Sequence, residues 1–460
     1  MGGPRRTRHV EEALVWRGTT GYEDVRTSML WNELTPQRFP EVIVQASSVQ
    51  DVVDAVGLAR SHGLRVAVRS GGHSWCGSPL RDGGMLIDLS RLREQSIDPA
   101  TATATVQPGV TGRDLALALE EHRLAFPVGH CGSVALGGYL LSGGLGWNSG
   151  SWGPACRSVR QIEAVTADGE LVVCDEERNS DLFWAARGAG PGFFAIVTAF
   201  RLGLHPLPAQ ITTTGYVFAL ADLAEVARWT DEIVAVLPPS VELSIVLGTA
   251  DPDLAAVPPG TAVVTVTATA FAAAPDEAAR LLAPLLACPL AGRALSRRPP
   301  EPAPFHVLFG GSGDLWPGRH RYAADTLWSS ADFATLLPRL AGPAVQAPSG
   351  RSLVLVVPAP AGRAGGQAPD MAFSALGGNY LVGYAIWDDP ARDEMNDRWL
   401  RETMRAVEPL GTGHYVAETD LLASPSRAPR SYAPAGWERL REIRAARDPE
   451  GLFEPYLSPA

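Results

Sequence analysis

The sequence predicts an α+β protein of two domains, and three observations support this prediction. The chain has 460 residues, which is more than a single hydrophobic core usually accommodates. Before about residue 207, short β-branched strands alternate with helical stretches over short connections. After residue 207 the chain is rich in proline and alanine, and several runs alternate apolar and polar residues. The first pattern is typical of compact α+β subdomains, and the second of a large antiparallel sheet with helices on one face.

The first part of the chain consists of strands and helices in regular succession. A strand at 42–44 leads through a turn into a helix, for which Ser47 or Ser48 supplies the N-cap. The alternating run 65–69 predicts a strand that enters a glycine-rich loop. Further strands are expected at 85–89 and 103–108, and a further helix at 111–122.

The second part contains runs with a period of two, which predict the strands of the large sheet. Helices accompany them at 223–236 and 276–283. Pro284 is expected to end the latter helix, because proline lacks a backbone N–H. A last helix is expected at 436–446. The strands are predicted at 241–246, 261–267, 353–357 and 380–387.

Composition excludes several classes of function. The formal net charge of -11 opposes binding to nucleic acid or to an anionic membrane surface, so we expect a small-molecule partner. The chain has no lysine, which excludes a P-loop lysine and a Schiff-base lysine. The N-terminus lacks the apolar core of a signal peptide, and no window approaches the roughly 18 apolar residues of a membrane span. We therefore expect a cytoplasmic protein.

The cysteines indicate neither a disulfide framework nor a zinc site. They are five in number and none of them has CxxC spacing, so no metal is expected. One of them lies only three residues after His73, where a packed, inert thiol is the simpler interpretation. The five are Cys76, Cys131, Cys156, Cys174 and Cys288.

Two glycine-rich runs carry reactive side chains. The first, 69–74, contains His73, and the second, 129–138, contains Cys131 and continues into 142–147. Because glycine has no Cβ, backbone N–H groups in such loops can pack directly on a phosphate or a flat ring. Alone, a Gly-Gly-His is more often a solvent-facing turn and a lone cysteine a buried small hydrophobe. The two runs together indicate a ligand site.

A third glycine run, Gly188 to Gly192, superficially matches a dinucleotide-binding fingerprint. That fingerprint requires a strand before it and a helix after it. Here a β-branched strand follows instead, so we reject this interpretation.

The two loops resemble those of the berberine bridge enzyme-like FAD-linked oxidases, which have a PCMH-type FAD-binding domain. The likeness covers most of residues 20 to 206, including 164–170 and 181–190, and returns at 437–440 and 448–453. It implies FAD joined through its 8α carbon to His73 and through C6 to Cys131. Many relatives carry only the histidine link, so Cys131 indicates the bicovalent subgroup.

The resemblance also implies a division of the chain. A discontinuous FAD-binding domain of two subdomains would comprise residues 1–206 and 406–460, and a substrate-binding domain 207–405, whose sheet covers the flavin ring. The other residues expected to bind the cofactor are Arg69, Ser70, Gly71, Gly72, Ser74, Val134, Gly137, Gly138, Gly143, Gly144 and Ile196.

The expected chemistry is oxidation of a hydroxyl-bearing secondary metabolite, for example in antibiotic biosynthesis, or of its sugar. FAD would take hydride from the substrate and pass electrons to molecular oxygen, giving hydrogen peroxide. Val134 corresponds to a family position with a small side chain that admits oxygen. Relatives suggest Tyr432 or Tyr380 as the catalytic base, although either would need help to ionise near neutral pH.

Two departures from the family fall where base and substrate meet. Relatives usually have Phe-Pro-His-Arg where this chain has 373–376, and Tyr-Tyr-Gly with an asparagine where it has 432–437. Two alternatives to simple oxidation therefore stay open. One is flavin-dependent oxidative cyclisation or desaturation of a natural product, and the other is a non-catalytic flavoprotein.

Overall fold

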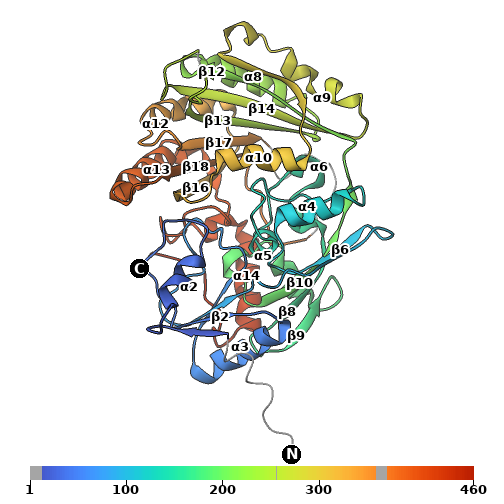
Figure 1. Ribbon diagram of the computed structural model, residues 1–460, viewed down its shortest axis with the longest axis vertical. Helices are drawn as coiled ribbons and strands as arrows, with labels where there is room; N and C mark the ends of the chain where they lie inside the picture. The colour runs from blue at the N-terminus through green and yellow to red at the C-terminus, as the bar shows by residue number, and fades with distance from the viewer. Residues whose placement is uncertain (1–12, 255, 359–369, 460) are drawn as a thin grey trace, which may run out of the picture.

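The computed structural model describes residues 13–254, 256–358 and 370–459. Two stacked domains are visible, with the large sheet and its helices above and the smaller sheets below (Figure 1). The predicted α+β class, with a large antiparallel sheet in the second domain, is confirmed.

The first sheet of the lower domain has four strands in the order β1-β2-β4-β3. Strands β2, β4 and β3 run parallel, and β1 is antiparallel to β2. The predicted N-cap is Ser48, whose side chain accepts the N–H of Asp51 while the Asp51 carboxylate accepts the N–H of Ser48. The elements are β1 (Leu14–Trp16), α2 (Tyr22–Ser28), β2 (Val42–Gln45), α3 (Val49–His62), β3 (Val66–Arg69) and β4 (Met85–Asp88).

The second sheet of the lower domain is antiparallel, in the order β5-β6-β10-β8-β9. Strands β7 and β11 form a separate pair. The strands are β5 (Gln95–Asp98), β6 (Thr103–Val106), β7 (Leu124–Ala125), β8 (Val159–Val165), β9 (Leu171–Cys174), β10 (Ile196–Gly203) and β11 (His205–Pro206). The helices are α4 (Gly112–Glu120), α5 (Leu136–Leu141), α6 (Ser149–Trp152) and α7 (Ser180–Ala186).

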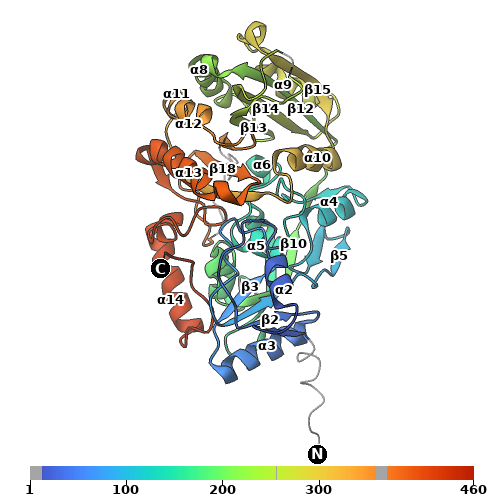
Figure 2. The same cartoon turned by 60° about the vertical axis from the view of Figure 1, so that its left-hand side comes forward.

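The last helix, α14 (Pro434–Arg447), lies alongside the lower domain (Figure 2). Its Leu440 and Ile443 belong to the core of that domain. Arg447 forms an ion pair with Asp181 at 2.7 Å, which joins α14 to α7. The first domain is thus assembled from both ends of the chain.

The upper domain contains an eight-stranded antiparallel sheet in the order β15-β12-β14-β13-β17-β18-β16-β19. The four predicted strands are present as β13, β14, β17 and β18. The strands are β12 (Gln210–Ala219), β13 (Val241–Thr249), β14 (Ala262–Ala272), β15 (Ser296–Pro302), β16 (Arg321–Ser329), β17 (Leu353–Pro358), β18 (Asn379–Trp387) and β19 (Gly411–Gly413).

All but one of the described helices of the upper domain pack on one face of its sheet, and the other face turns toward the lower domain (Figure 1). The exception is α10 (Phe305–Leu315), whose Phe305, Leu308 and Phe309 belong to the core of the lower domain. Strand β18 shows the alternation: Leu381 and Ala385 pack under the helices, whereas Tyr380 and Tyr384 join an aromatic cluster on the opposite face. The helices are α8 (Leu223–Val234), α9 (Glu277–Leu286), α10 (Phe305–Leu315), α11 (Phe333–Leu336), α12 (Ala341–Val345) and α13 (Asp393–Val407).

Two details differ from the sequence-based expectations. Helix α9 continues through Pro284, because its buried leucines, including Leu285, hold the last turn against the sheet. Proline removes only one hydrogen bond so near the end of a helix. In addition, α13 spans the predicted boundary at 405, and β19 pairs with β16, so the sheet reaches beyond that boundary.

Candidate active site

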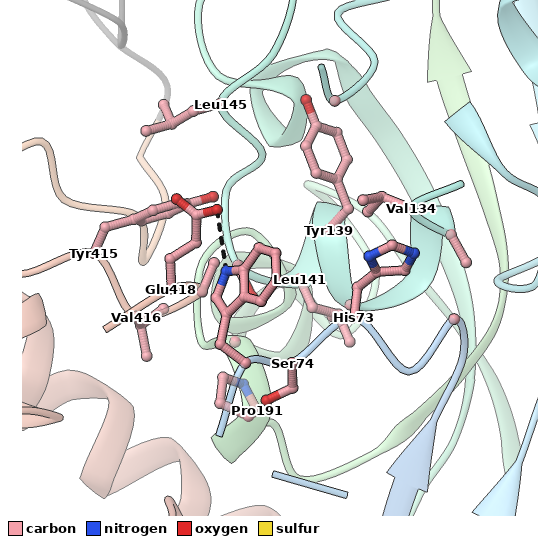
Figure 3. Close-up of a pocket in the computed structure, with 18 of the residues that line it drawn as sticks. His73, Ser74, Val134, Tyr139, Leu141, Leu145, Pro191, Tyr415, Val416 and Glu418 are labelled. Atoms are coloured by element: carbon pink, nitrogen blue, oxygen red, sulfur yellow. Dashed lines mark hydrogen bonds between the residues drawn. The ribbon is translucent and has the colours of Figure 1, made fainter. Parts of the chain in front are cut away.

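A cavity of about 330 Å³ lies between the two domains. One wall consists of the two glycine-rich loops, and the other consists of sheet residues and the segment 415–419. Figure 3 shows His73 and Val134 on one side of this space and Tyr415 and Glu418 on the other. We call these the loop wall and the sheet wall.

The loop wall begins where β3 ends. Arg69 pairs with Asp88 at 2.7 Å and donates to the carbonyl of Met29, which fixes the start of the loop. Gly72 has a φ of 73°, and a Cβ there would lie 2.2 Å from the Met29 oxygen, so this turn requires glycine. The backbone N–H groups of residues 70–74 donate to no described residue. They are available to a ligand in the cavity.

The two loops are in direct contact. A Cβ on Gly71 would lie 2.8 Å from that of Ala135, and one on Gly137 would lie 2.2 Å from Ser70 Oγ. These glycines therefore allow loop-to-loop packing. Gly138 differs, because a Cβ there would meet no heavy atom within 4 Å, and this residue also lines the cavity.

Ser133 brings the two predicted nucleophiles together. Its Oγ lies 3.1 Å from Nε2 of His73 and 3.3 Å from Sγ of Cys131, although His73 and Cys131 are far apart in sequence. Trp31 stacks on the His73 ring with centroids 4.8 Å apart. Burial, with a smaller contribution from Arg69, lowers the pKa of His73 to about 4. The imidazole is therefore neutral at pH 7 and keeps a nucleophilic lone pair.

The sheet wall is organised around the carboxylate of Glu418. Tyr380 donates a short hydrogen bond to Oε2, and Tyr384 donates to Oε1 at 3.0 Å. Trp75 donates its indole N–H to Oε1 at 3.4 Å. Burial, followed by the charge of Glu418, raises the pKa of both tyrosines well above the ordinary value. Tyr380, one of the two expected bases, therefore lines the cavity as a neutral phenol.

Most of the predicted cofactor residues line the cavity, and three do not. Gly143 is covered by Phe373, and Gly144 packs on Ala155, so their role is to let the loop pass close to its neighbours. Ile196 is fully buried in the core of the lower domain. The predicted residues that line the cavity are Arg69, Ser70, Gly71, Gly72, His73, Ser74, Cys131, Val134, Gly137 and Gly138.

Tyr432, the other expected base, does not line the cavity. Its hydroxyl group donates to the backbone carbonyl of Ala189 at 3.0 Å and contacts Tyr456 Oη at 3.0 Å. Its ring stacks on Trp437. Burial raises its pKa well above the ordinary value. Tyr432 thus joins α14 to the lower domain, which argues against the predicted role as a base.

Sequence reasoning missed Glu418, Tyr384 and Tyr415. Glu418 lies in an irregular segment without a repeating pattern, so its sequence carries no signal for a site. Tyr384 follows Tyr380 by four residues in one strand, so it points to the same face, and period-two reasoning could have found it. Tyr415 accepts the N–H of Gly144 at 3.1 Å, a contact between domains that only the fold reveals.

Over residues 13–254, 256–358 and 370–459, no group of three or more His, Cys, Asp or Glu side chains could hold a metal ion. Within the same ranges, no helix has the length and apolar character needed to cross a membrane.

Solved structures share this two-domain arrangement. The 6-hydroxy-D-nicotine oxidase of Arthrobacter nicotinovorans superposes with a TM-score of 0.82 over 96 % of each chain, at 23 % identity. BBE-like 1 of Physcomitrella patens gives a TM-score of 0.82 over 98 % of each chain, at 20 % identity. The chain therefore shares the fold of these two proteins.

Sequence relatives define the family. A family model described as an FAD binding domain matches residues 40–175. An FAD-linked oxidoreductase of Penicillium ochrochloron is 34 % identical over 407 residues, which is 88 % of either chain. This chain therefore belongs to the FAD-linked oxidoreductases, and the resemblance to berberine bridge enzyme-like proteins is confirmed.

The residues of the loop wall fit FAD. Five successive N–H groups, those of residues 70–74, lack partners among the described residues, and such groups bind the oxygens of a diphosphate. The open space at Gly138 allows a flat ring to approach the backbone. When bound, FAD supplies the redox chemistry of the site.

Proposed function

We propose that this protein is an oxidase that holds FAD covalently through His73 and Cys131. It would act on a hydroxyl-bearing secondary metabolite or its sugar, with molecular oxygen as the electron acceptor. The single observation that carries this proposal is the contact of both nucleophiles with one hydroxyl group, that of Ser133.

The proximity of the two side chains supports attachment of both to one flavin ring. His73 Nε2 is bonded to Ser133, whereas Nδ1 has no hydrogen bond to any described residue and is the nitrogen free to react. Each link would replace one hydrogen on the flavin and one on the side chain. Each attachment is therefore a two-electron oxidation, with oxygen as the electron acceptor.

Glu418 is the group best suited to accept the proton of the substrate hydroxyl. Its carboxylate already receives hydrogen bonds from the hydroxyl groups of Tyr380 and Tyr384. A substrate hydroxyl would give its proton to Glu418 directly or through Tyr380. In the second case Tyr380 passes its phenol proton to Glu418 and takes up the proton of the substrate. In this arrangement Tyr380 is a relay, and the carboxylate is the base.

The remaining wall residues support a bulky, largely apolar substrate. Leu355 and Val357 from β17 line the same cavity as the rings of Trp75 and Trp316. Bound FAD would take hydride from the substrate carbon and pass two electrons to oxygen, giving hydrogen peroxide. Val134, three residues after Cys131, also lines the cavity, and we expect its small side chain to admit oxygen.

Acid precipitation combined with peroxide detection tests the proposal. We expect a yellow pellet whose colour survives in the single variants His73→Ala and Cys131→Ala and disappears in the double variant. Hydroxyl-bearing compounds that reduce the flavin anaerobically should then release stoichiometric peroxide when oxygen is admitted. Flavin that washes free of the wild-type pellet, or reduction without peroxide, would refute the attachment or the oxidase reaction, respectively.

A further inference from the structure

A second pair of ionisable side chains faces the same cavity and has no part in the function proposed above. His130, beside Cys131 on the loop wall, lies with Nε2 2.6 Å from Oε1 of Glu242. Glu242 belongs to β13 of the upper domain, so the pair spans the two domains. Both residues line the cavity, and the His130 side chain keeps 30 % of its accessible surface.

The pair is held in a fixed orientation. The second oxygen of Glu242 accepts the backbone N–H of Asn148 at 3.2 Å, so both carboxylate oxygens are engaged. Asn148 has a φ of 59°, an uncommon conformation for a residue other than glycine. In this conformation its backbone N–H donates to Glu242. The His130 ring packs on Trp147 with centroids 4.2 Å apart.

This geometry determines the protonation pattern of the imidazole. A carboxylate at Nε2 requires a hydrogen on that nitrogen, so the neutral ring presents the lone pair of Nδ1. Nδ1 makes no hydrogen bond to the residues that the structure describes. A carboxylate that orients an imidazole and stabilises its protonated form is the arrangement that enzymes use for a general base.

The electrostatic surroundings favour uptake of a proton. Burial alone would lower the pKa of His130, but Glu242, through its charge and its hydrogen bond, and more weakly Glu418, raise it above the ordinary value. Among the ionisable groups acting on His130, both carboxylates work in the same direction.

We infer that His130 and Glu242 form a second acid–base site of the cavity, which accepts the proton of an acidic hydroxyl, such as a phenol or an enol, on the substrate. This inference rests on the proposed function, since it concerns the substrate of that cavity. The hydroxyl gives its proton to Nδ1 of His130, and an imidazolium forms. The Nε2–H group stays hydrogen-bonded to Glu242 throughout. The proton returns from Nδ1 to the hydroxyl oxygen when the product leaves. The substrate class is thereby narrowed to compounds with an acidic hydroxyl besides the position that is oxidised.

The probe for this site is 4-nitrophenol, whose anion has its own visible absorption band. We would titrate the purified flavin-loaded protein at saturating probe and record difference spectra across pH. We expect the bound probe to ionise at least about tenfold more readily than the free probe, which corresponds to about one pKa unit. His130→Gln keeps a donor for Glu242 but lacks a basic nitrogen. This variant should abolish the gain, that is, the increase in ionisation of the bound probe over the free probe.

Matched variants identify the proton acceptor. Glu242→Gln should reduce the gain, because the imidazolium loses its counter-charge, whereas Glu418→Gln should retain most of it. Glu438→Gln, on the exposed face of α14, controls for a general loss of charge. A gain that persists in His130→Gln, or is absent from the wild-type protein at saturation, overturns the inference. Flavin content, measured on the same samples, reports separately on the proposed function.

Discussion

The two walls of the cavity are built by different means. The loop wall uses backbone groups: glycines that allow close packing and five N–H groups at residues 70–74. The sheet wall uses side chains, with Glu418, Tyr380 and Tyr384 brought together from β18 and an irregular segment. A backbone site suits a constant ligand such as a cofactor, whereas side chains can be exchanged without altering the fold. We therefore propose that the first wall binds the cofactor and that the second accepts the proton released when the substrate is oxidised.

The largest effect is expected on the sheet wall. Glu418→Gln should lower turnover by about 10²–10⁴-fold, because the site loses its proton acceptor, while flavin content stays at the wild-type level. Stopped-flow flavin reduction with any compound oxidised in the peroxide screen measures this. Loss of flavin together with turnover would mean that the two walls do not divide their tasks in this way.

The corresponding change on the loop wall is Gly72→Ala. The left-handed backbone and the close Met29 oxygen should destabilise the fold by about 1–3 kcal/mol and lower flavin content. Urea unfolding and the flavin-to-protein ratio measure both effects. Gly310→Ala is the matched control, since a Cβ in this exposed part of α10 meets nothing and should be neutral or stabilising by up to about 1 kcal/mol. Equal losses in the two variants would contradict the assignment.

Each wall has a nearby histidine with a lowered pKa, and each histidine should make the stability of the protein depend on pH. Behind the sheet wall, burial and Arg427 lower the pKa of His414 to about 4. The unfolded chain therefore binds more protons between about pH 4 and 6.5, and stability falls as pH decreases through this window. The slope from this residue is at most about 1.4 kcal/mol per pH unit, and His414→Gln should remove it.

The loop wall offers the contrasting case. The pKa of His73 is also lowered to about 4, so a chain without attached flavin should show the same acid destabilisation from this residue. Attachment through a ring nitrogen would change that titration. Urea unfolding at pH 5 and pH 7 should therefore differ between flavin-loaded and flavin-free protein, and identical pH slopes would count against the link at His73.

The smallest effect is expected for Tyr432→Phe. The lost hydrogen bonds to the Ala189 carbonyl and to Tyr456 should lower stability by about 0.5–1.5 kcal/mol, without changing turnover. Thermal unfolding and the peroxide assay measure this, with Tyr380→Phe as the variant that should lose turnover. A large loss of activity in Tyr432→Phe would restore Tyr432 as a candidate base.

Local patterns made much of the fold predictable. The Ser48 cap and four strands of the large sheet could be read from residue types and period alone. Strand β15 could not, because it is rich in proline and exposed, and proline is tolerated only at a sheet edge such as the position beside β12. Strand β16 is buried along nearly its whole length, so it lacks the alternation that marks a strand.

The candidate site also has a part that the sequence predicts, the loop wall, and a part that it largely does not predict, the sheet wall. The loop wall consists of two short glycine-rich runs, 69–74 and 129–138, and each run carries its own nucleophile, so both can be identified from sequence. The position of Glu418 depends on tertiary contacts: Asp325 of β16 accepts the Thr419 hydroxyl at 2.8 Å and the Asp420 N–H at 3.1 Å. No local pattern encodes such contacts, so the sequence points to Tyr432 and Tyr380 as bases and not to Glu418.

Peptide mapping of the trypsin-digested protein tests the covalent flavin without reference to any substrate. Cleavage at arginine releases residues 70–81, with His73, and residues 124–157, with Cys131, as separate peptides. A flavin joined to both side chains would hold these peptides together, and we expect one yellow species with the summed mass of the two peptides and one attached FAD. Recovery of both peptides unmodified, with FAD free in solution, would contradict the account.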